Sequence, residues 1–320
     1  MDAEALRERR EARRRALRRR RAQVFGLIGA CAIAVAAIVA ISGGATRKKS
    51  PPATSSASSA DGRQAAGHSA STPSASSGGR PGKTAVPILM YHVIAAPPPG
   101  APFPGLYVPP AEFAEQMQAL KNAGWHAVTL DQVAANWRRG ASLGAGKPIV
   151  LTFDNGYQSQ FTQAFPVLQR LGWVGDENIQ LSGLPPSQGG LGEAEVRGLI
   201  AAGWELDTQG FSHADLIRLG AEQLHYEVAV TRGVLQRRYH VPVNWFCYPS
   251  GHYDSTVIAA VRGAGYAGST TVVPGWASPS EDVDRLPRLR VLGGTSGQAL
   301  LAQVASTREA PAAPSSYNGG

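Results

Sequence analysis

Two spacings of hydrophobic residues alternate along residues 84–305. Short apolar runs rich in β-branched and aromatic residues predict buried strands, and the stretches between them place apolar residues every three or four positions, as amphipathic helices do. The predicted strands are residues 86–92, 125–129, 148–153, 179–181, 204–206, 245–248 and 266–270. The predicted helices are residues 110–123, 130–139, 161–171, 193–202, 221–239 and 255–264. This succession predicts an α/β fold around a parallel sheet, and the pattern leaves open whether that sheet closes into a barrel.

A different apolar pattern occupies residues 24–42, which are 19 consecutive residues without a charge. A membrane-spanning helix needs about 20 apolar residues. Residues 1–23 contain ten Arg against four acidic residues, which predicts a cytoplasmic N-terminus by the positive-inside rule. We therefore expect a cytoplasmic segment (1–23), a transmembrane signal anchor (24–42) and a single-pass cell-membrane protein with an extracellular C-terminal domain. A cleaved signal peptide, with a weak cleavage site at residues 42–45, is the alternative.

The distribution of charge argues against a nucleic-acid-binding protein. The chain has a formal net charge of +8. Residues 1–49 account for +9 of it, so the remaining residues sum to about −1. Because the basic residues flank the apolar run, they fit the ends of a membrane anchor, and we expect no nucleic-acid partner.

Two segments lack the large apolar residues that a folded core requires. Residues 43–83 consist mainly of Ser, Ala, Gly, Pro and Thr, a composition typical of a flexible, disordered linker. Residues 306–320 have a similar composition and predict a second disordered tail. The folded domain is therefore expected to span residues 84–305, a length sufficient for one α/β domain.

The most informative chemical signal follows the predicted strand 148–153. This strand is followed directly by Asp154, Asn155 and Gly156. In parallel α/β folds, side chains just past the carboxyl ends of the strands face the ligand-binding crevice. The sequence therefore places a carboxylate and a neutral amide where chemistry is expected.

Five segments resemble motifs of the polysaccharide deacetylase family, also called the NodB homology domain or carbohydrate esterase family 4. They are residues 86–92, 152–156, 203–216, 246–251 and 286–291, which read VPILMYH, TFDNG, GWELDTQGFSHADL, FCYPSG and LPRLRV. The first is similar to the opening strand of the secreted poly-N-acetylglucosamine deacetylase branch. The resemblance implies a distorted (β/α)7 barrel, here preceded by the transmembrane helix and the linker, and removal of acetyl groups from N-acetylated sugars.

The resemblance also implies roles for individual residues. Asp154 matches the first Asp of the family motif T-F-D-D-G, which is the general base, and His92 matches the histidine that acts as general acid. The family's metal ligands are the second Asp of that motif and two histidines, which here are Asn155, Gln209 and His213. Two of the three metal-binding positions therefore carry neutral amides.

This substitution makes a family-type zinc site doubtful. Zinc prefers imidazole nitrogen, thiolate and carboxylate oxygen, and one imidazole with two amides provides no negative charge. Asn155 alone would not exclude activity, since some relatives that act on muramic acid carry T-F-D-N, but Gln209 weakens the site further. A divalent metal held by Asp154 and His213, with His92 or Asp207, remains an option.

Further residues are expected around the substrate. The backbone N–H of Ser250 is a candidate oxyanion-hole donor. Arg288 or Arg290 is expected to orient Asp154 through an ion pair. The candidate lining of a substrate groove comprises Tyr248, Pro249, His252 and Trp276.

The retained acid and base favour a hydrolase that deacetylates an N-acetylated glycan, either peptidoglycan or an exopolysaccharide. The altered metal positions leave two alternatives open. One is a catalytically inactive domain that binds cell-wall glycan, and the other is an unrelated reaction in the same cleft.

Overall fold

The computed structural model describes residues 80–184 and 189–319. The predicted segments 1–23 and 24–42, and nearly all of the predicted linker 43–83, lie outside these residues. Within the described residues, every helix is too short or too polar to span a lipid bilayer. The description that follows concerns the folded domain alone.

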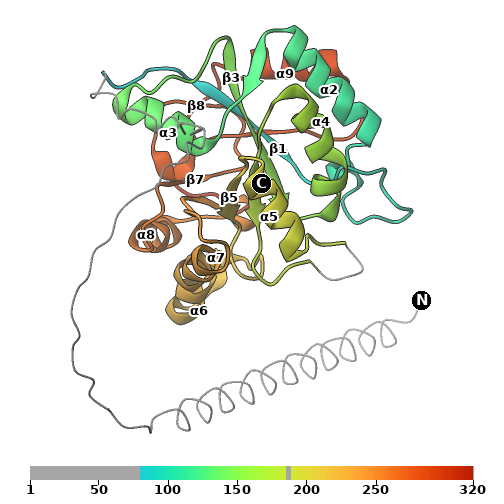
Figure 1. Cartoon of the computed structure of the whole chain (residues 1–320). Helices are drawn as coiled ribbons and strands as arrows, with labels where there is room; N and C mark the ends of the chain where they lie inside the picture. The colour runs from blue at the N-terminus through green and yellow to red at the C-terminus, as the bar shows by residue number, and fades with distance from the viewer. Residues whose placement is uncertain (1–79, 185–188, 320) are drawn as a thin grey trace, which may run out of the picture. The chain divides into compact units, whose positions relative to one another are not determined.

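A curled sheet of mostly parallel strands forms the centre of the domain (Figure 1). Its parallel strands are β1 (Val86–Tyr91), β3 (Lys147–Asn155), β4 (Asp176–Ile179), β5 (Glu205–Thr208), β6 (Trp245–Cys247), β7 (Gly268–Thr270) and β9 (Leu289–Arg290). They are ordered β7-β6-β5-β4-β3-β1, and β9 pairs with the free edge of β1. Two short strands, β2 (Trp125–Ala127) and β8 (Trp276–Ala277), pair with the beginnings of β3 and β1.

The segment around β9 bridges the two ends of this sheet. On one side, Leu286 forms a parallel bridge with Thr270 of β7. On the other side, the N–H of Val291 donates to the carbonyl of Met90 in β1 (3.1 Å). The arrangement fits the distorted (β/α)7 barrel that the sequence resemblance implied.

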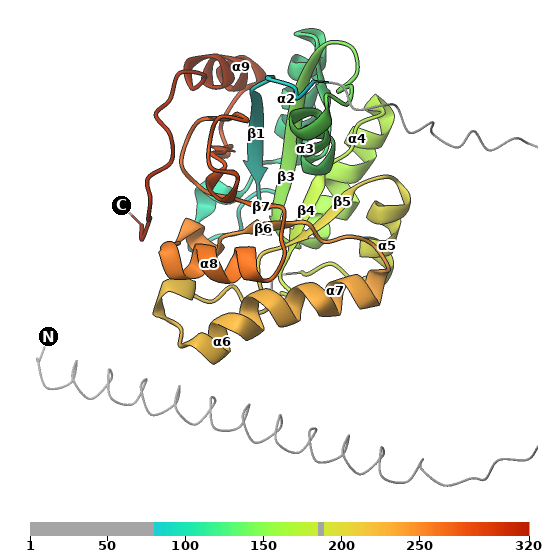
Figure 2. The same cartoon turned by 90° about the vertical axis from the view of Figure 1, so that its left-hand side faces the viewer.

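Helices cover the outside of the strands (Figure 2). Their bounds are α2 (Pro110–Asn122), α3 (Leu130–Arg139), α4 (Phe165–Leu171), α5 (Glu193–Ala201), α6 (Ala221–His225), α7 (Thr231–Tyr239), α8 (Ser255–Gly263) and α9 (Gly297–Ser306). Two π-helical turns, Gln160–Ala164 and Tyr226–Val230, precede α4 and α7. The 3-10 turns are Pro104–Leu106, Leu216–Arg218, Pro249–Gly251 and Val283–Arg285. The outward side chains of β1 and β3 pack with α2, α4 and α9 into one buried cluster.

The inside of the sheet changes character along the strands. Near the amino ends it is apolar, with Val86, Ile88, Val150 and Trp245 in one buried cluster. Beyond this cluster, from the level of Thr152 in β3 and Asp176 in β4, the inward side chains are buried and polar. They are Thr152, Asp154, Asp176, Asn178, Asp207 and Arg288. A polar interior is costly unless its groups pair with one another, so these residues are candidates for function.

Several sequence expectations differ from the structure. Strand β4 begins at Asp176, before the predicted 179–181, because its inward positions are polar and break the apolar pattern. The predicted helix 221–239 contains a π-helical turn, where the Thr231 hydroxyl donates to the Tyr226 carbonyl (3.1 Å). The predicted disordered tail 306–320 instead packs on the domain up to residue 319, and Tyr317 exchanges two backbone hydrogen bonds with Tyr253 (2.8 and 2.9 Å).

Candidate functional site

Asp154 lies at the end of β3, on the inside of the sheet and only 1% exposed. Its Oδ1 accepts from Asn178 Nδ2 and Arg288 Nη1, each at 2.8 Å. Its Oδ2 accepts from Arg288 Nη2 (2.9 Å) and lies 3.5 Å from Cys247 Sγ. Burial alone would raise the pKa of Asp154, but the Arg288 guanidinium outweighs burial and lowers this pKa to about 2. Asp154 is therefore a permanent anion at neutral pH.

Arg288 is the residue that orients Asp154. It is completely buried and binds the carboxylate through both terminal nitrogens, the bidentate geometry that favours Arg over Lys. Its Nε also donates to the Thr271 carbonyl (2.7 Å), and Nη1 donates to Thr152 Oγ1 (2.9 Å). Arg290, the other candidate, has an exposed side chain. The two arginines are therefore distinguished by burial: the Arg288 side chain is buried against Asp154, whereas the Arg290 side chain reaches solvent.

His92 follows β1 and lies beside Asp154. Its Nε2 is 4.0 Å from Asp154 Oδ2, and its side chain is 13% exposed. Burial lowers the pKa of His92 to about 4, although the negative charge of Asp154 opposes this shift. Among the described residues, Nδ1 has no hydrogen-bond partner. His92 is therefore a neutral imidazole at neutral pH, and it reaches solvent where Asp154 does not.

Gln160, in the π-helical turn before α4, fixes these two residues relative to each other. Its Nε2 donates to the backbone carbonyls of both His92 and Asp154, each at 2.8 Å. The Gln160 side chain is completely buried. π-helical turns within helices occur frequently at functional sites, and here the turn brings one side chain to the ends of two neighbouring strands.

The three positions that match the family's metal ligands do not fit a zinc ion. Asn155 and His213 adopt left-handed backbone conformations with φ of 79° and 58°, and both are half-buried. Gln209 is buried, and its Oε1 has no partner among the described residues. Burial lowers the pKa of His213. The set contains no anionic ligand, so it cannot offset the charge of zinc, and we derive no chemistry from a metal at this place.

One acidic group in the described part of the chain is arranged so that it could hold a metal ion. It consists of Asp176, Glu205 and Asp207, each of which offers an oxygen within 4.8 Å of the others. These residues come from the inward faces of β4 and β5 and are not the predicted ligands. This acidic cluster is therefore a different candidate metal site from the one that the motifs predicted.

The predicted groove residues near the end of β6 have different surroundings. Ser250 is exposed, with φ of 56°, at the same end of the sheet as Asp154. His252 is half-buried, and its Nδ1 lies 2.9 Å from Asp215 Oδ1. Tyr248 and Pro249 were expected to line the groove, but both are buried, and the Tyr248 hydroxyl donates to the Asp284 carbonyl (2.9 Å). Both side chains are therefore part of the buried interior, and Tyr248 belongs to a buried apolar cluster.

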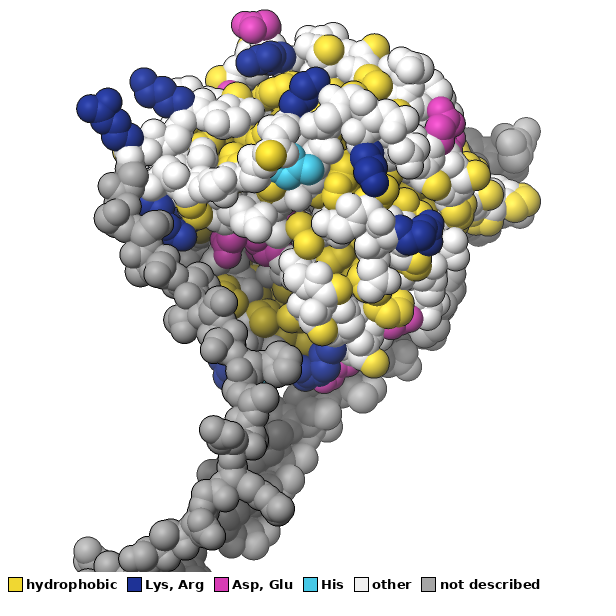
Figure 3. All heavy atoms as spheres, turned by 45° about the horizontal axis from the view of Figure 1, so that its top comes forward, with side chains coloured by type: hydrophobic (Ala, Val, Ile, Leu, Met, Phe, Trp, Pro, Cys, Tyr) yellow, Lys and Arg dark blue, Asp and Glu magenta, His cyan; other side chains and the backbone are white. Residues whose placement is uncertain are grey.

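Trp276 was also expected in the groove, but the structure does not bring it to Asp154. It lies in β8, opposite Pro87 at the beginning of β1, and therefore at the amino end of the sheet. There it lines a cavity of about 560 Å³ together with Trp125 and Arg308. Figure 3 shows this end of the molecule, where hydrophobic side chains reach the surface between separate Lys and Arg side chains.

The sequence reasoning did not identify several residues that contact Asp154 or its neighbours. They are Asn178, Gln160, Thr152 and Cys247. The run Asp176-Glu177-Asn178 was the available signal for the first of them, because polar residues are unusual in a buried parallel strand. The contacts of Gln160 depend on a π-helical turn, which the sequence pattern does not reveal.

Comparison with known proteins finds polysaccharide deacetylases among the proteins that this chain resembles. Residues 143–269 match the family model for polysaccharide deacetylase. The Bacillus subtilis protein YxkH, named as a polysaccharide deacetylase, is 27% identical over 224 residues, which cover 70% of this chain and 77% of that protein. Residues 143–269 therefore resemble a polysaccharide deacetylase domain.

Two further proteins are similar to this chain. The Streptococcus pyogenes deacetylase PplD, solved in complex with acetate, superposes with a TM-score of 0.63 at 25% identity over 69% of this chain and 99% of that one. The poly-β-1,6-N-acetyl-D-glucosamine N-deacetylase of Escherichia coli is 42% identical over 59 residues, 18% of this chain and 9% of that protein. The similarity to the latter is thus confined to a short segment.

Proposed function

We propose that this protein deacetylates an N-acetylated polysaccharide of the cell wall or the extracellular matrix, without the zinc site of its relatives. The observation that carries the proposal is the group of Asp154, His92 and Arg288 at the carboxyl ends of the strands. This arrangement retains an anion and an imidazole within 4.0 Å of each other. The polysaccharide deacetylase family supports the reaction class.

The protonation states determine how the pair would act. At neutral pH, Asp154 is ionised and His92 is neutral, so neither carries a proton that it can donate. The pair must therefore accept a proton from the attacking water before it returns one to the departing amine. Both oxygens of Asp154 already accept hydrogen bonds, so His92 is the group that exchanges the proton, and Asp154 stabilises the imidazolium that forms.

Other groups at this end of the sheet suit a glycan substrate. The backbone N–H of Ser250 remains our candidate donor to the developing oxyanion. A cavity of about 440 Å³ is lined by Val93 and Ile94, which follow His92 in the chain, and by Tyr157, two residues after Asn155. The name of the Escherichia coli relative favours an N-acetylglucosamine polymer as the substrate class, and peptidoglycan, which also contains N-acetylated sugars, is a second candidate.

A glycan-binding protein without hydrolytic activity is the second candidate. The observation that favours it is the replacement of two metal-binding positions by Asn155 and Gln209, combined with the 1% exposure of Asp154. In that case the cleft would retain the sugar and leave the acetyl group in place.

Acetate release discriminates between the two candidates. Purified full-length protein is incubated with β-1,6-linked N-acetylglucosamine oligomers, chitin oligomers and peptidoglycan, and free acetate is measured. We expect release that added zinc does not accelerate, and a loss of about 10²-fold or more in rate for His92→Gln. The control is His225→Gln, which changes an exposed histidine of α6. Binding of a polymer without acetate release would establish the glycan-binding candidate instead.

We further propose that the domain is extracellular and held at the cell membrane by residues 24–42. The uncharged length of this run and the arginines before it support the proposal. An extracellular domain would meet the polymers named above.

A further inference from the structure

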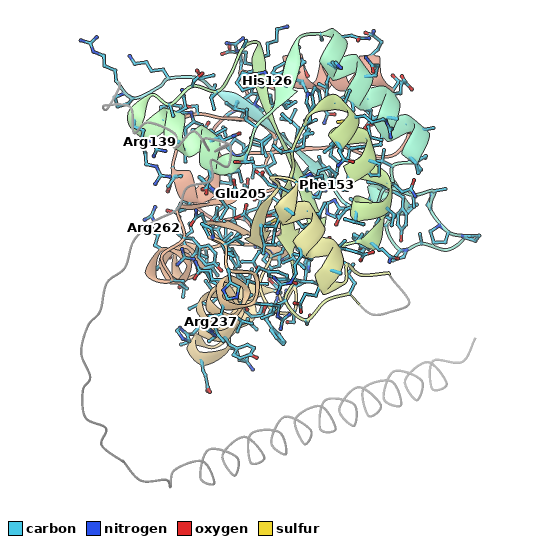
Figure 4. The ribbon with its side chains drawn as sticks, in the orientation of Figure 1. His126, Arg139, Phe153, Glu205, Arg237 and Arg262 are labelled. Carbon is cyan, nitrogen blue, oxygen red and sulfur yellow. The ribbon has the colours of Figure 1, made fainter. Side chains whose placement is uncertain are left out.

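Three carboxylates meet inside the sheet, away from the proposed proton-transfer pair. Asp176 lies opposite Glu205 in the register of β4 and β5, and Asp207 follows two residues later on the same face as Glu205. Asp176 and Asp207 are completely buried. Figure 4 shows Glu205 in the middle of the domain, among the strands.

Each carboxylate is anchored through one oxygen only. Asp176 Oδ2 accepts from the Leu130 N–H, Glu205 Oε2 from the Asp131 N–H, and Asp207 Oδ1 from the Trp245 N–H, all at 2.9 Å. The second oxygens are Asp176 Oδ1, Glu205 Oε1 and Asp207 Oδ2. All three are buried, and none has a hydrogen-bond partner among the described residues.

The neutral side chain of Asn178, next to the cluster, also has a buried oxygen without a hydrogen-bond partner among the described residues. Asn178 is 1% exposed and lies opposite Asp207 in register. Its Nδ2 donates to Asp154 on the β3 side, and its Oδ1, the other atom of the amide, has no partner within the described residues. The region between β4 and β5 therefore presents four buried oxygens for which the described residues supply no N–H donor, a costly arrangement unless protons or a cation lie among them.

The spacing of the carboxylates suits a metal ion. Any three atoms within 4.8 Å of one another share a point no more than about 2.8 Å from each, close to the 2.3–2.6 Å of a calcium–oxygen bond. We propose that Asp176, Glu205 and Asp207 bind a hard divalent cation, Ca²⁺ or Mn²⁺, inside the barrel. Oxygen-only ligands select such ions over zinc, and a site this buried disfavours Mg²⁺, which retains its water.

The cation would act on the fold rather than on the substrate. The three anchored oxygens hold the first residues of α3 and of β6 against β4 and β5. A divalent ion would reduce the charge of three ionised carboxylates from −3 to −1 and so relieve the repulsion between them at this junction.

Metal binding by the full-length protein tests the proposal directly. The protein is treated with a chelator, dialysed and titrated with MnCl₂, and bound Mn²⁺ is followed by electron paramagnetic resonance, with CaCl₂ as competitor. We expect one Mn²⁺ per chain, displaced by Ca²⁺, and a rise in the thermal unfolding midpoint of the chelator-treated protein. Absence of both a bound ion and a thermal shift in the wild-type protein would overturn the proposal.

Variants locate the ion. Asp207→Asn and Asp176→Asn should each weaken Mn²⁺ binding at least 10-fold. Asp131→Asn is the matched control, since it removes one nearby negative charge whose two oxygens already accept from Asn244 and Trp245, and it should change binding less than threefold. His213→Ala should leave binding unchanged. Loss of binding in His213→Ala, with binding retained in Asp207→Asn, would assign the ion to the family's position and refute the site.

Discussion

At the scale of single residues, the site depends on one buried ion pair. Arg288 and Asp154 are 0% and 1% exposed, so each loses its hydration on folding and relies on the other. Such a pair contributes little net stability compared with a well-packed apolar pair, but removing one partner leaves an uncompensated buried charge. This asymmetry makes Arg288 and Arg290, two residues apart, an informative comparison.

Replacing Arg288 should destabilise the protein strongly. Arg288→Met leaves Asp154 buried without its cation, and we expect a loss of about 3–5 kcal/mol in the free energy of unfolding. Arg290→Met, at an exposed position, should change it by less than about 0.5 kcal/mol. Urea unfolding of both variants measures the difference. Equal effects would show that the ion pair is not buried as described.

The buried imidazole of His92 predicts a pH dependence of stability. Burial lowers the folded pKa of His92 to about 4, below its ordinary value of 6.5, so the unfolded chain takes up the proton first as the pH falls. Neutral His92 therefore contributes about 3 kcal/mol to the free energy of unfolding above pH 6.5. This contribution is lost as the pH falls from 6.5 to 4. Asp154 acts in a separate window, since its pKa of about 2 costs stability only below pH 4.

The comparison of His92→Gln with wild type isolates this contribution. The free energy of unfolding is measured at several pH values from 7 to 4, and slopes common to both proteins cancel in the difference. We expect the wild type to lose stability more steeply than His92→Gln as the pH falls. His225→Gln, exposed on α6, serves as control and should behave as the wild type. Parallel curves for His92→Gln and wild type would contradict the buried neutral state.

Individual site residues could be predicted only where position along a strand determines their environment. Asp154 follows directly from its apolar run, because a residue at the carboxyl end of a parallel strand faces the crevice. Trp276 could not be placed this way, since the sequence does not reveal that β8 runs antiparallel at the opposite end of β1. The role of Asn178 depends on the register of β4 against β3, which no local pattern specifies.

At the scale of elements, helices with complete terminal signals were predicted best. Helix α3 spans Leu130–Arg139 as predicted, because Thr129 forms a capping box with Gln132 and Gly140 ends the helix in a left-handed conformation. Strand β4 was predicted too far along the chain, because its polar residues break the apolar pattern. Helix α9 follows the last predicted strand and was not predicted, although Ser296 caps it and the buried Leu300 and Val304 are four residues apart, as in an amphipathic helix.

The loop between β6 and α8 offers a test at this scale. Gly251 has φ of 74°, and an added Cβ would collide with the Val272 side chain. Gly251→Ala should therefore cost about 2 kcal/mol or more. Gly263, at the end of α8, has open space around its Cβ position, so Gly263→Ala should be neutral or stabilise by up to about 1 kcal/mol. Thermal unfolding of the two variants compares them, and a stable Gly251→Ala would show that this loop can rearrange.

At the scale of the whole molecule, the folded domain extends beyond the predicted boundary at residue 305. Besides the Tyr317 bridge, the Tyr253 hydroxyl donates to the Pro314 carbonyl (2.8 Å), and Arg285 Nη1 donates to the Ala313 carbonyl (3.1 Å). Composition alone predicted disorder here, because these contacts are made mainly by backbone groups, which sequence composition does not describe. The domain thus ends close to the loop that carries His252.

The charge and hydropathy of the first fifty residues lead to a prediction about where the whole protein resides. If residues 24–42 are an uncleaved anchor, the full-length protein should remain in the membrane fraction after an alkaline carbonate wash, and protease added outside the cell should remove the C-terminal domain. Ile33→Arg combined with Val35→Arg should reduce the membrane fraction, since each Arg near the centre of the span costs about 2.5–3.5 kcal/mol. Ile33→Leu combined with Val35→Leu is the matched control and should stay in the membrane. Recovery of the wild-type domain in the medium, with a new N-terminus near residues 42–45, would identify residues 24–42 as a cleaved signal peptide and leave the domain free to reach glycan far from the membrane.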